Sequence, residues 1–192
     1  MTKRSGLLRI ISGSKKGYKL KSPKGLDTRP TQDRIKESLF SILGDIRIEA
    51  KVLDLFAGSG GIGIEFLSRG AGECYFIDNS LSSIKTINEN LYETNLKSKS
   101  YVYKNDVFKA IKILGKKNIR FDYIFMDPPY EKGLVLETLK IVCENNILED
   151  RGIIIAEHES KLMIDKSVFC LNEVDKRFYG DKAITFYMTK RN

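Results

Sequence analysis

The residues best suited to chemistry form the segment Asp-Pro-Pro-Tyr, which follows an apolar run. A carboxylate oxygen of Asp127 and the main-chain carbonyl of Pro128 can each accept a hydrogen bond from one N–H of an amino group on a base ring. Pro128 and Pro129 each fix their own φ and restrict the residue before them, so both acceptors are held in place in advance. Tyr130 offers a flat face on which an unstacked base can lie. The segment therefore predicts a site that positions an exocyclic amino nitrogen as a nucleophile.

A second segment has the glycine spacing of nucleotide-binding loops. Gly58, Gly60 and Gly63 follow an apolar run and precede a helical pattern. Asp78 stands twenty residues beyond Gly58 and closes the next apolar run, where its carboxylate can accept hydrogen bonds from both hydroxyls of a ribose. The loop, the helix and the distal carboxylate together predict a cofactor that contains a nucleoside.

Asp54 stands before the glycines and indicates which cofactor fits. A dinucleotide would bring a pyrophosphate close to this carboxylate, and at roughly 6 Å each pair of like charges costs about 3 kcal/mol. S-adenosylmethionine has no phosphate and presents an ammonium and a sulfonium, which a carboxylate stabilises. Asp106 follows the third apolar run, where the adenine amino group of that cofactor would lie. These residues favour S-adenosylmethionine over a nicotinamide dinucleotide.

Strands alternate with helices along most of the chain, which predicts an α/β fold with a parallel sheet. The apolar runs expected to be strands are 51–58, 73–78, 100–106, 121–127 and 152–157. The periodic segments expected to be helices are 31–43, 62–70, 80–96, 107–115 and 134–145. Residues 167–190 hold two apolar runs without a helix between them, so the sheet should end in an antiparallel hairpin. The acidic residues described above then meet at the carboxyl ends of the strands, where such sheets bind ligands.

The net charge of +8 is concentrated in the first 36 residues, which contain eleven Lys and Arg against two Asp. A basic block on an otherwise balanced chain favours a polyanionic partner, because each neutralised phosphate releases counterions. Buried-type residues stand among these charges, so we expect a basic N-terminal extension at 1–30, with a β-hairpin at 7–20, beside a Rossmann-like domain at 31–192. A solvated tail is the alternative.

Composition argues against several other classes of protein. No apolar run is long enough to span a membrane and the N-terminus lacks the apolar segment of a secretory signal, so we expect a cytoplasmic protein. Cys74, Cys143 and Cys170 are odd in number and far apart, which favours reduced core cysteines over a disulfide frame or a zinc site. With His158 as the single histidine, we expect no metal. Nothing in the sequence demands more than a monomer.

Six segments follow one another in the order and spacing of a known family: RIISGSKKGYKL, TRPTQDRIKESLF, DLFAGSGGIGIEFLSRGA, FIDNS, FMDPPY and RFYGDKAITFY. Through them the chain resembles, nearly end to end, the RsmD family of bacterial 16S rRNA (guanine-N2) methyltransferases. The glycine loop and DPPY alone indicate a class I amino-methyltransferase, and the first two segments make the match specific. The resemblance implies a class I fold with a seven-stranded sheet. It also implies transfer of a methyl group from S-adenosylmethionine to N2 of one guanine of 16S rRNA, on a 30S particle or an assembly intermediate.

The resemblance also implies roles by position. The target guanine would be held by Asp127, Pro128, Pro129 and Tyr130. The cofactor would contact Asp54, Ala57, Gly58, Ser59, Gly60 and Gly63 with its methionine half, Asp78 and the adjoining Asn79 with its ribose, and Asp106 and Val107 with its adenine. The inferred RNA contacts are Arg9, Lys15, Lys16, Lys19 and Arg29. Many relatives have Glu where this chain has Asp78, which leaves the hydrogen-bonding role intact.

Three alternatives stay open at this point. Other amino-methyltransferases of the same architecture act on adenine N6 in DNA or on a glutamine side chain, and Asp at 127 favours a nucleic acid over glutamine without excluding DNA. A nicotinamide-dependent oxidoreductase would also use a glycine loop. A non-catalytic RNA-binding module would need only the basic N-terminal segment.

Overall fold

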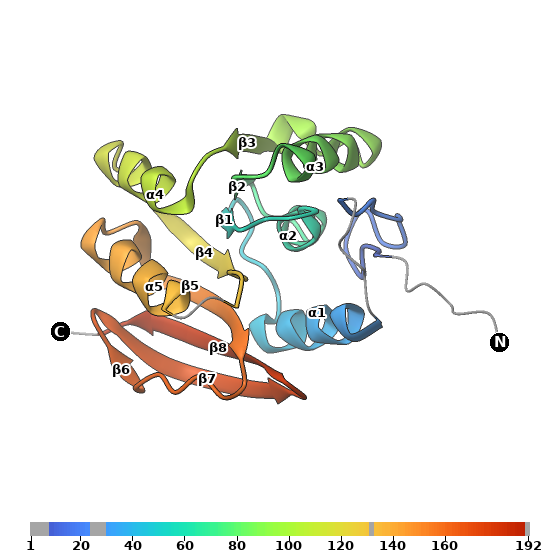
Figure 1. The fold of residues 1–192 in the computed structure, drawn as a ribbon. Helices are drawn as coiled ribbons and strands as arrows, with labels where there is room; N and C mark the ends of the chain where they lie inside the picture. The colour runs from blue at the N-terminus through green and yellow to red at the C-terminus, as the bar shows by residue number, and fades with distance from the viewer. Residues whose placement is uncertain (1–7, 24–29, 131–132, 191–192) are drawn as a thin grey trace.

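The computed structural model of the chain describes residues 8–23, 30–130 and 133–190. Its centre is an eight-stranded sheet in the order β3-β2-β1-β4-β5-β8-β7-β6 (Figure 1). The parallel strands are β1 Lys51–Leu55, β2 Glu73–Asp78, β3 Ser100–Lys104, β4 Phe121–Met126 and β5 Leu148–Glu159. The antiparallel strands are β6 Ser167–Val168, β7 Leu171–Tyr179 and β8 Lys182–Thr189. This sheet confirms the predicted α/β fold with its closing hairpin.

The sheet has one strand more than the seven expected. The addition is β6, which pairs antiparallel with the start of β7. Two residues are too few to give an alternating apolar pattern, so nothing in the sequence marks β6 as a strand.

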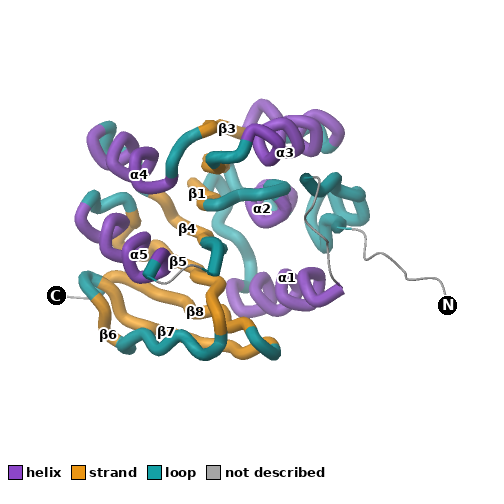
Figure 2. The backbone as a smooth tube through the Cα atoms, in the orientation of Figure 1, coloured by secondary structure: helices purple, strands orange, loops and turns teal. Residues whose placement is uncertain are grey.

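Helices cover both faces of the sheet (Figure 2). One face packs against α1 Pro30–Leu43, α2 Gly61–Ser68 and α3 Leu81–Glu93, whose buried side chains form one apolar cluster with that face. The other face packs against α4 Val107–Lys116 and α5 Leu134–Glu144 in a second cluster. A single 3₁₀ turn, Lys97–Lys99, links α3 to β3. The two clusters are the two layers of core that a parallel sheet requires.

The N-terminal segment packs onto the face covered by α1 and α2. Leu8, Ile10 and Leu20 are buried in the same apolar cluster as that face. The predicted hairpin is reduced to one isolated antiparallel bridge between Arg9 and Lys19, flanked by short backbone hydrogen bonds. A Cβ added at Gly13 would lie 1.9 Å from the carbonyl oxygen of Ser68, so only glycine allows this close approach of the loop to α2.

The cysteines correct one prediction. Cys143 on α5 and Cys170 before β7 form a disulfide, so the prediction that all three cysteines are reduced is wrong. Cys74 on β2 is the free one, and it is buried. The bridged cysteines are 27 positions apart in the sequence, and the segment between them includes β5 and β6. The packing of the closing hairpin beside α5 brings them together. Sequence spacing carries no signal for such a long-range contact.

In the part of the chain that the structure describes, no helix is long and apolar enough to cross a membrane. Over the same ranges, no three His, Cys, Asp or Glu side chains are grouped in a way that could hold a metal ion. His158 is buried, and its Nε2 lies 2.8 Å from Thr185 Oγ1 and its Nδ1 2.8 Å from the Glu159 carbonyl oxygen. This histidine thus has two hydrogen-bond partners within the fold, as a structural residue does.

Candidate active site

A cavity of about 730 Å³ opens at the carboxyl ends of the parallel strands. Its walls come from the loop after β1, the end of β2, the start of α4, the loop after β4, and β5 and β8. The N-terminal segment and α1 complete the wall with Leu8, Ser22, Pro23, Ile35 and Lys36. This is the edge of the sheet where the sequence predicts a ligand site.

Strand register brings five charged side chains to this cavity on one face of the sheet: Asp54, Asp78, Asp127, Glu157 and Lys182. Side chains alternate along a strand, so residues two positions apart point to the same face. Two positions away from these five along the chain stand five apolar residues: Val52, Phe76, Phe125, Ile155 and Ile184. All five belong to the apolar cluster under α1, α2 and α3. The alternation of side chains along each strand therefore decides which face of the sheet these residues point to. The direction of each strand decides whether its end lies at the cavity.

Asp54 lies on β1 and is hydrogen-bonded to the first turn of α2. Its Oδ2 accepts a hydrogen bond of 2.9 Å from the backbone N–H of Gly63, and its side chain is almost fully buried. Burial raises the pKa of Asp54 to about 8, the Gly63 bond opposes the rise, and the charge of Asp78 adds to it. A cation brought into the cavity would stabilise the carboxylate. Gly63 has no room for a side chain, because a Cβ there would lie 2.4 Å from the ring of Phe76.

Asp78 closes β2 and is held by backbone donors on both of its oxygens. Oδ2 accepts from the N–H of Gly58 at 2.8 Å, and Oδ1 accepts from the N–H of Ser80 at 2.8 Å. Each carboxylate oxygen has a second lone pair, so the side chain can still accept two hydroxyl donors while staying in a fixed orientation. This geometry suits a ribose with two vicinal hydroxyls.

The adenine end of the predicted cofactor site lies where β3 gives way to α4. Asp106 comes two residues after β3 and is the N-cap of α4, with Oδ1 accepting from the N–H of Lys109 at 3.0 Å. Asp106, Val107 and Asn79 all line the cavity. Capping uses only part of the acceptor capacity of Asp106, so its carboxylate can also accept from an amino group.

The loop after β4 faces the glycine loop across the cavity. Asp127 and Tyr130 line the cavity, and Tyr130 is 53% exposed. Burial raises the pKa of Asp127 to about 7, with the charge of Glu157 adding to the rise and that of Lys182 opposing it. The carboxyl group therefore exchanges its proton near neutral pH. Residues 131–132, just beyond, lie outside the described part.

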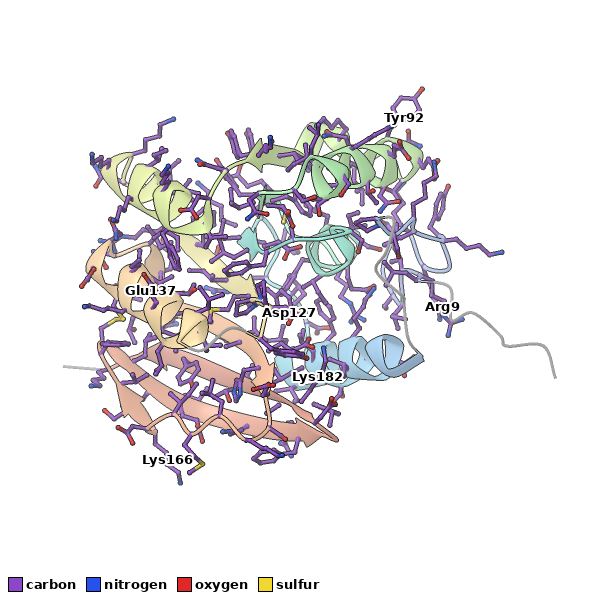
Figure 3. The ribbon with its side chains drawn as sticks, in the orientation of Figure 1. Arg9, Tyr92, Asp127, Glu137, Lys166 and Lys182 are labelled. Atoms are coloured by element: carbon purple, nitrogen blue, oxygen red, sulfur yellow. A yellow bond between two sulfur atoms is a disulfide. The ribbon has the colours of Figure 1, made fainter. Side chains whose placement is uncertain are left out.

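Glu157 and Lys182 were not predicted for the site. They form an ion pair across β5 and β8, and Lys182 Nζ also lies 5.6 Å from the centre of the Tyr130 ring. Figure 3 shows Lys182 and Asp127 near the middle of the molecule. Burial lowers the pKa of Lys182, but its contact with Glu157 outweighs this and raises it overall. The alternation Ile155, Glu157 at a strand end could have identified the acid, whereas nothing local marks the lysine.

Most of the predicted site residues meet in the cavity. Those lining it are Asp54, Ala57, Gly58, Ser59, Asp78, Asn79, Asp106, Val107, Asp127, Pro129 and Tyr130. Gly60, Gly63 and Pro128 are buried next to these residues in the chain without lining the wall. Gly60 and Gly63 shape the glycine loop. Among the predicted hydrogen-bond acceptors, Pro128 is the residue that does not line the cavity.

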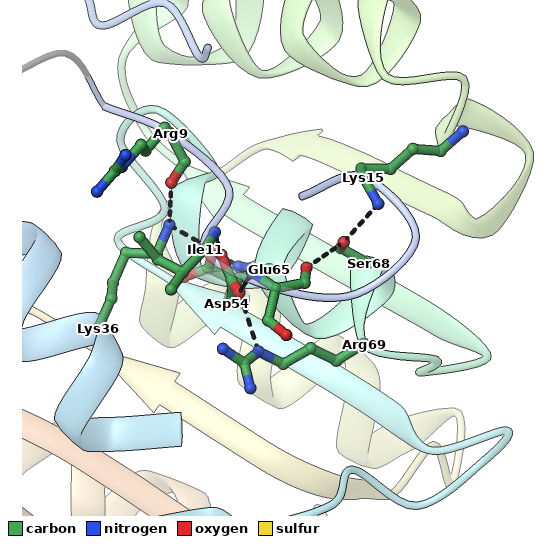
Figure 4. A network of polar contacts seen from close by, with 10 residues as sticks. Arg9, Ile11, Lys15, Lys36, Asp54, Glu65, Ser68 and Arg69 are labelled. Carbon is green, nitrogen blue, oxygen red and sulfur yellow. Dashed lines mark hydrogen bonds and ion pairs between the residues drawn. The ribbon is translucent and has the colours of Figure 1, made fainter. Parts of the chain in front are cut away.

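Of the predicted RNA contacts, Arg9, Lys15, Lys16 and Lys19 lie on the N-terminal loop, which a buried carboxylate ties to α2 (Figure 4). Glu65 accepts from the backbone N–H of Ile11 and Ser12 at 2.8 and 2.9 Å, and it pairs with Lys36 and Arg69. The loop is thereby fixed on the wall of the cavity to which Leu8, Ser22 and Pro23 belong.

This anchoring leaves basic side chains on the surface of the loop. Arg9, Lys16 and Lys19 are exposed, and Lys15 is partly exposed while its backbone N–H donates to Ser68 Oγ at 3.0 Å. Arg29 lies outside the described residues. The loop, whose residue Leu8 lines the cavity, therefore presents several cations on the surface of the molecule.

Comparison with known proteins agrees with this geometry. A family model described as "Conserved hypothetical protein 95", which represents the RsmD family, matches residues 8–188. The chain is 41% identical to YlbH of Bacillus subtilis over 180 residues, covering 94% of this chain and 98% of that protein. It is 36% identical over 155 residues to "Ribosomal RNA small subunit methyltransferase D" of Escherichia coli, covering 81% of this chain and 76% of the relative.

Solved structures show the same fold. The structure of YhhF from Escherichia coli superposes with a TM-score of 0.83 at 26% sequence identity, over 96% of this chain and 99% of that one. The match spans the N-terminal loop, the glycine loop, the loop after β4 and the closing hairpin. The chain belongs to the RsmD family of class I methyltransferases.

Proposed function

We propose that this protein transfers a methyl group from S-adenosylmethionine to the exocyclic N2 of one guanine in 16S rRNA, on a 30S particle or an assembly intermediate. Family membership supports rRNA as the substrate, since the relative in Escherichia coli is named as a small-subunit rRNA methyltransferase. The observation that carries the proposal is the position of Asp127. It directly follows β4, which pairs with β1, so it lies across the cavity from the glycine loop, with the exposed Tyr130 nearby in the chain.

The residues on the glycine side fit S-adenosylmethionine. Asp54 is a buried carboxyl group with no ion pair among the contacts of the described residues, and burial raises its pKa to about 8, so a cationic ligand would stabilise its ionised form. Asp78 has acceptor capacity for the ribose hydroxyls, and Asp106 for the adenine amino group. When bound, this cofactor supplies an electrophilic methyl group on a positively charged sulfur.

On the other side of the cavity, the loop after β4 orients the amino group. Its nitrogen lone pair is delocalised into the base ring, so the amine becomes a useful nucleophile only when it is held in line with its electrophile. Asp127 and the Pro128 carbonyl would each accept one N–H. After methylation the nitrogen has one proton in excess, and a carboxylate with a pKa of about 7 can take it. Tyr130 would stack on the extruded ring.

The N-terminal loop would hold the RNA backbone. Its exposed cations contribute sequence-independent affinity, while the cavity selects the base. Residues Arg9, Lys15, Lys16 and Lys19 are the proposed phosphate contacts, together with Arg29 outside the described part.

The test is methyl incorporation from labelled S-adenosylmethionine into small-subunit particles from cells that lack the enzyme, with duplex DNA and total protein assayed in parallel. We expect label in rRNA alone, recovered after nuclease digestion as N2-methylguanosine. Label in N6-methyladenosine or in methylglutamine would overturn the proposal. Cofactor choice is checked separately by thermal shift, where S-adenosylhomocysteine should stabilise the protein and NAD should not.

A further inference from the structure

The ion pair of Glu157 and Lys182 has a position that fold stability alone does not explain. Both side chains line the cavity, and Glu157 is only 6% exposed. A buried ion pair loses most of its electrostatic gain to desolvation, so it is a weak reason for a protein to keep two charges in its interior. The pair stands at the edge of the sheet that the loop after β4 shares.

Strand register places this pair next to the residue that holds the amino group. Met126 pairs with Ala156 in the parallel β4–β5 ladder, so Asp127 and Glu157 are neighbours at the next position along. Lys182 begins β8, contacts Glu157, and has its Nζ 5.6 Å from the centre of the Tyr130 ring. Along the cavity wall the carboxyl group of Asp127 is therefore followed by that of Glu157 and then by the ammonium of Lys182. The ring of Tyr130 lies beside them.

Guanine presents the complementary order along its Watson–Crick edge: the N2 amino group, the N1–H donor and the O6 acceptor. Resting on the proposed function, we infer that Glu157 accepts the N1–H and Lys182 donates to O6 of the same guanine whose N2 amino group Asp127 holds. The pair then determines which base is methylated, while Asp127 determines which atom. Enzymes that extrude a base read this edge by hydrogen bonds of this kind.

The same groups reject adenine. Adenine N1 is an acceptor and would face the carboxylate of Glu157, and its 6-amino group is a donor that would face the ammonium of Lys182. A site built to bond particular polar groups discriminates strongly against a base that lacks them, because its own buried groups are left without partners. Tyr130 stacks on either purine and gives no discrimination.

The experiment uses rRNA in which the target guanine, located by nucleoside mapping, is replaced by 2-aminopurine. This base keeps the amino group that receives the methyl but lacks both N1–H and O6. We expect the wild-type enzyme to have a kcat/KM at least about 100-fold higher for guanine than for 2-aminopurine, as two lost base contacts imply. In the double variant Glu157→Leu/Lys182→Met, this preference should fall to less than about fivefold, mainly through loss of the guanine rate.

The double variant removes both charges together, so neither is left buried and unpaired. A matched control is Arg47→Met/Asp122→Leu, which removes an ion pair of 3.0 Å beside the opposite end of β4. This control should keep the wild-type preference. Affinity for S-adenosylhomocysteine should be unchanged in both variants, which shows that the cavity is folded.

Two results would overturn the inference in distinguishable ways. A wild-type enzyme that forms no N2-methylguanosine defeats the proposed function and the inference with it. A wild-type enzyme that methylates guanine, together with a Glu157→Leu/Lys182→Met variant that keeps the full preference over 2-aminopurine, defeats the inference alone.

Discussion

The two halves of the cavity are built in different ways. In the half proposed to hold the cofactor, carboxyl groups are held by backbone N–H groups of one βαβ unit: Asp54 by Gly63, and Asp78 by Gly58 and Ser80. In the half proposed to hold the base, side chains from different elements contact one another, as Lys182 does with Glu157 and Tyr130. Hydrogen bonds from the backbone suit a site for one invariant ligand. A cluster of side chains can be altered by substitution to suit a different base.

The two halves of the cavity also differ in how their charges are balanced. In the half proposed to hold the cofactor, Asp54 has no ion pair among the described contacts, so we expect a cationic ligand to stabilise it. The base half already contains Lys182, which offsets the charges of Asp127 and Glu157. Substitutions in the two halves should therefore affect different measurements.

The largest effect should come from Asp127→Ala, which removes the acceptor that orients the amino group and takes its proton. We expect kcat for rRNA methylation to fall at least about a thousandfold, within the range for loss of a positioned base. The matched variant Asp127→Asn keeps one acceptor oxygen and should lose less. Single-turnover methyl transfer measures both. A rate for Asp127→Ala near that of the wild type would contradict the role given to the loop.

Next in size is the effect of Asp78→Ala on cofactor binding. The change removes the acceptor for two backbone N–H groups and for the ribose, so affinity for S-adenosylhomocysteine should fall about tenfold to a hundredfold. Asp122→Ala is the matched control. Asp122 also accepts a backbone N–H, that of Lys51 at 2.8 Å, but near the amino end of β4. Calorimetric titration should show weakened binding for Asp78→Ala alone, and equal losses would mean that both act through stability.

A smaller effect is expected from pH. Asp127 must be ionised to take the proton of the methylated amine, and its pKa is raised to about 7, so the rate should fall as pH drops through 7, to about a tenth between pH 8 and pH 6. Glu157→Gln keeps an acceptor oxygen but removes the negative charge that adds to this rise. Its rate profile should therefore shift to lower pH. An unshifted profile would show that the titrating group is not Asp127.

The smallest effect should follow neutralisation of the N-terminal loop. The triple variant Lys15→Ala/Lys16→Ala/Lys19→Ala should weaken rRNA binding and reduce the slope of log affinity against log salt by about 1 for each lysine that contacts a phosphate. The control set is Lys112 and Lys116 on α4 with Lys117 directly after it; all three are exposed, and α4 lies on the other side of the molecule from the N-terminal loop (Figure 1). An equal loss of rRNA affinity and salt slope in both sets would show that the N-terminal loop is only a solvated surface with no specific role in RNA binding.

The two halves also differ in how far the sequence predicts them. The cofactor half follows from contiguous patterns, because Gly58, Gly63 and Asp78 lie on one βαβ unit, and the structure brings them together as expected. The DPPY segment was also predicted to form a site, because its residues are contiguous. Glu157 and Lys182 were not predicted to lie in the site, because their contact depends on the pairing of β5 with β8. The Cys143–Cys170 bridge escaped prediction for the same reason, since no local spacing encodes a long-range contact.

The division between the halves is tested most directly by titrating S-adenosylhomocysteine into Asp54→Ala and Asp127→Ala. Asp54 is expected to face the cofactor's ammonium, so its loss should weaken binding at least about tenfold, as loss of a charged hydrogen bond does. Asp127→Ala, although inactive, should bind within about threefold of the wild type. If Asp127→Ala loses as much cofactor affinity as Asp54→Ala, the cavity is one undivided cofactor site and the assignment of Asp127 to the base is wrong.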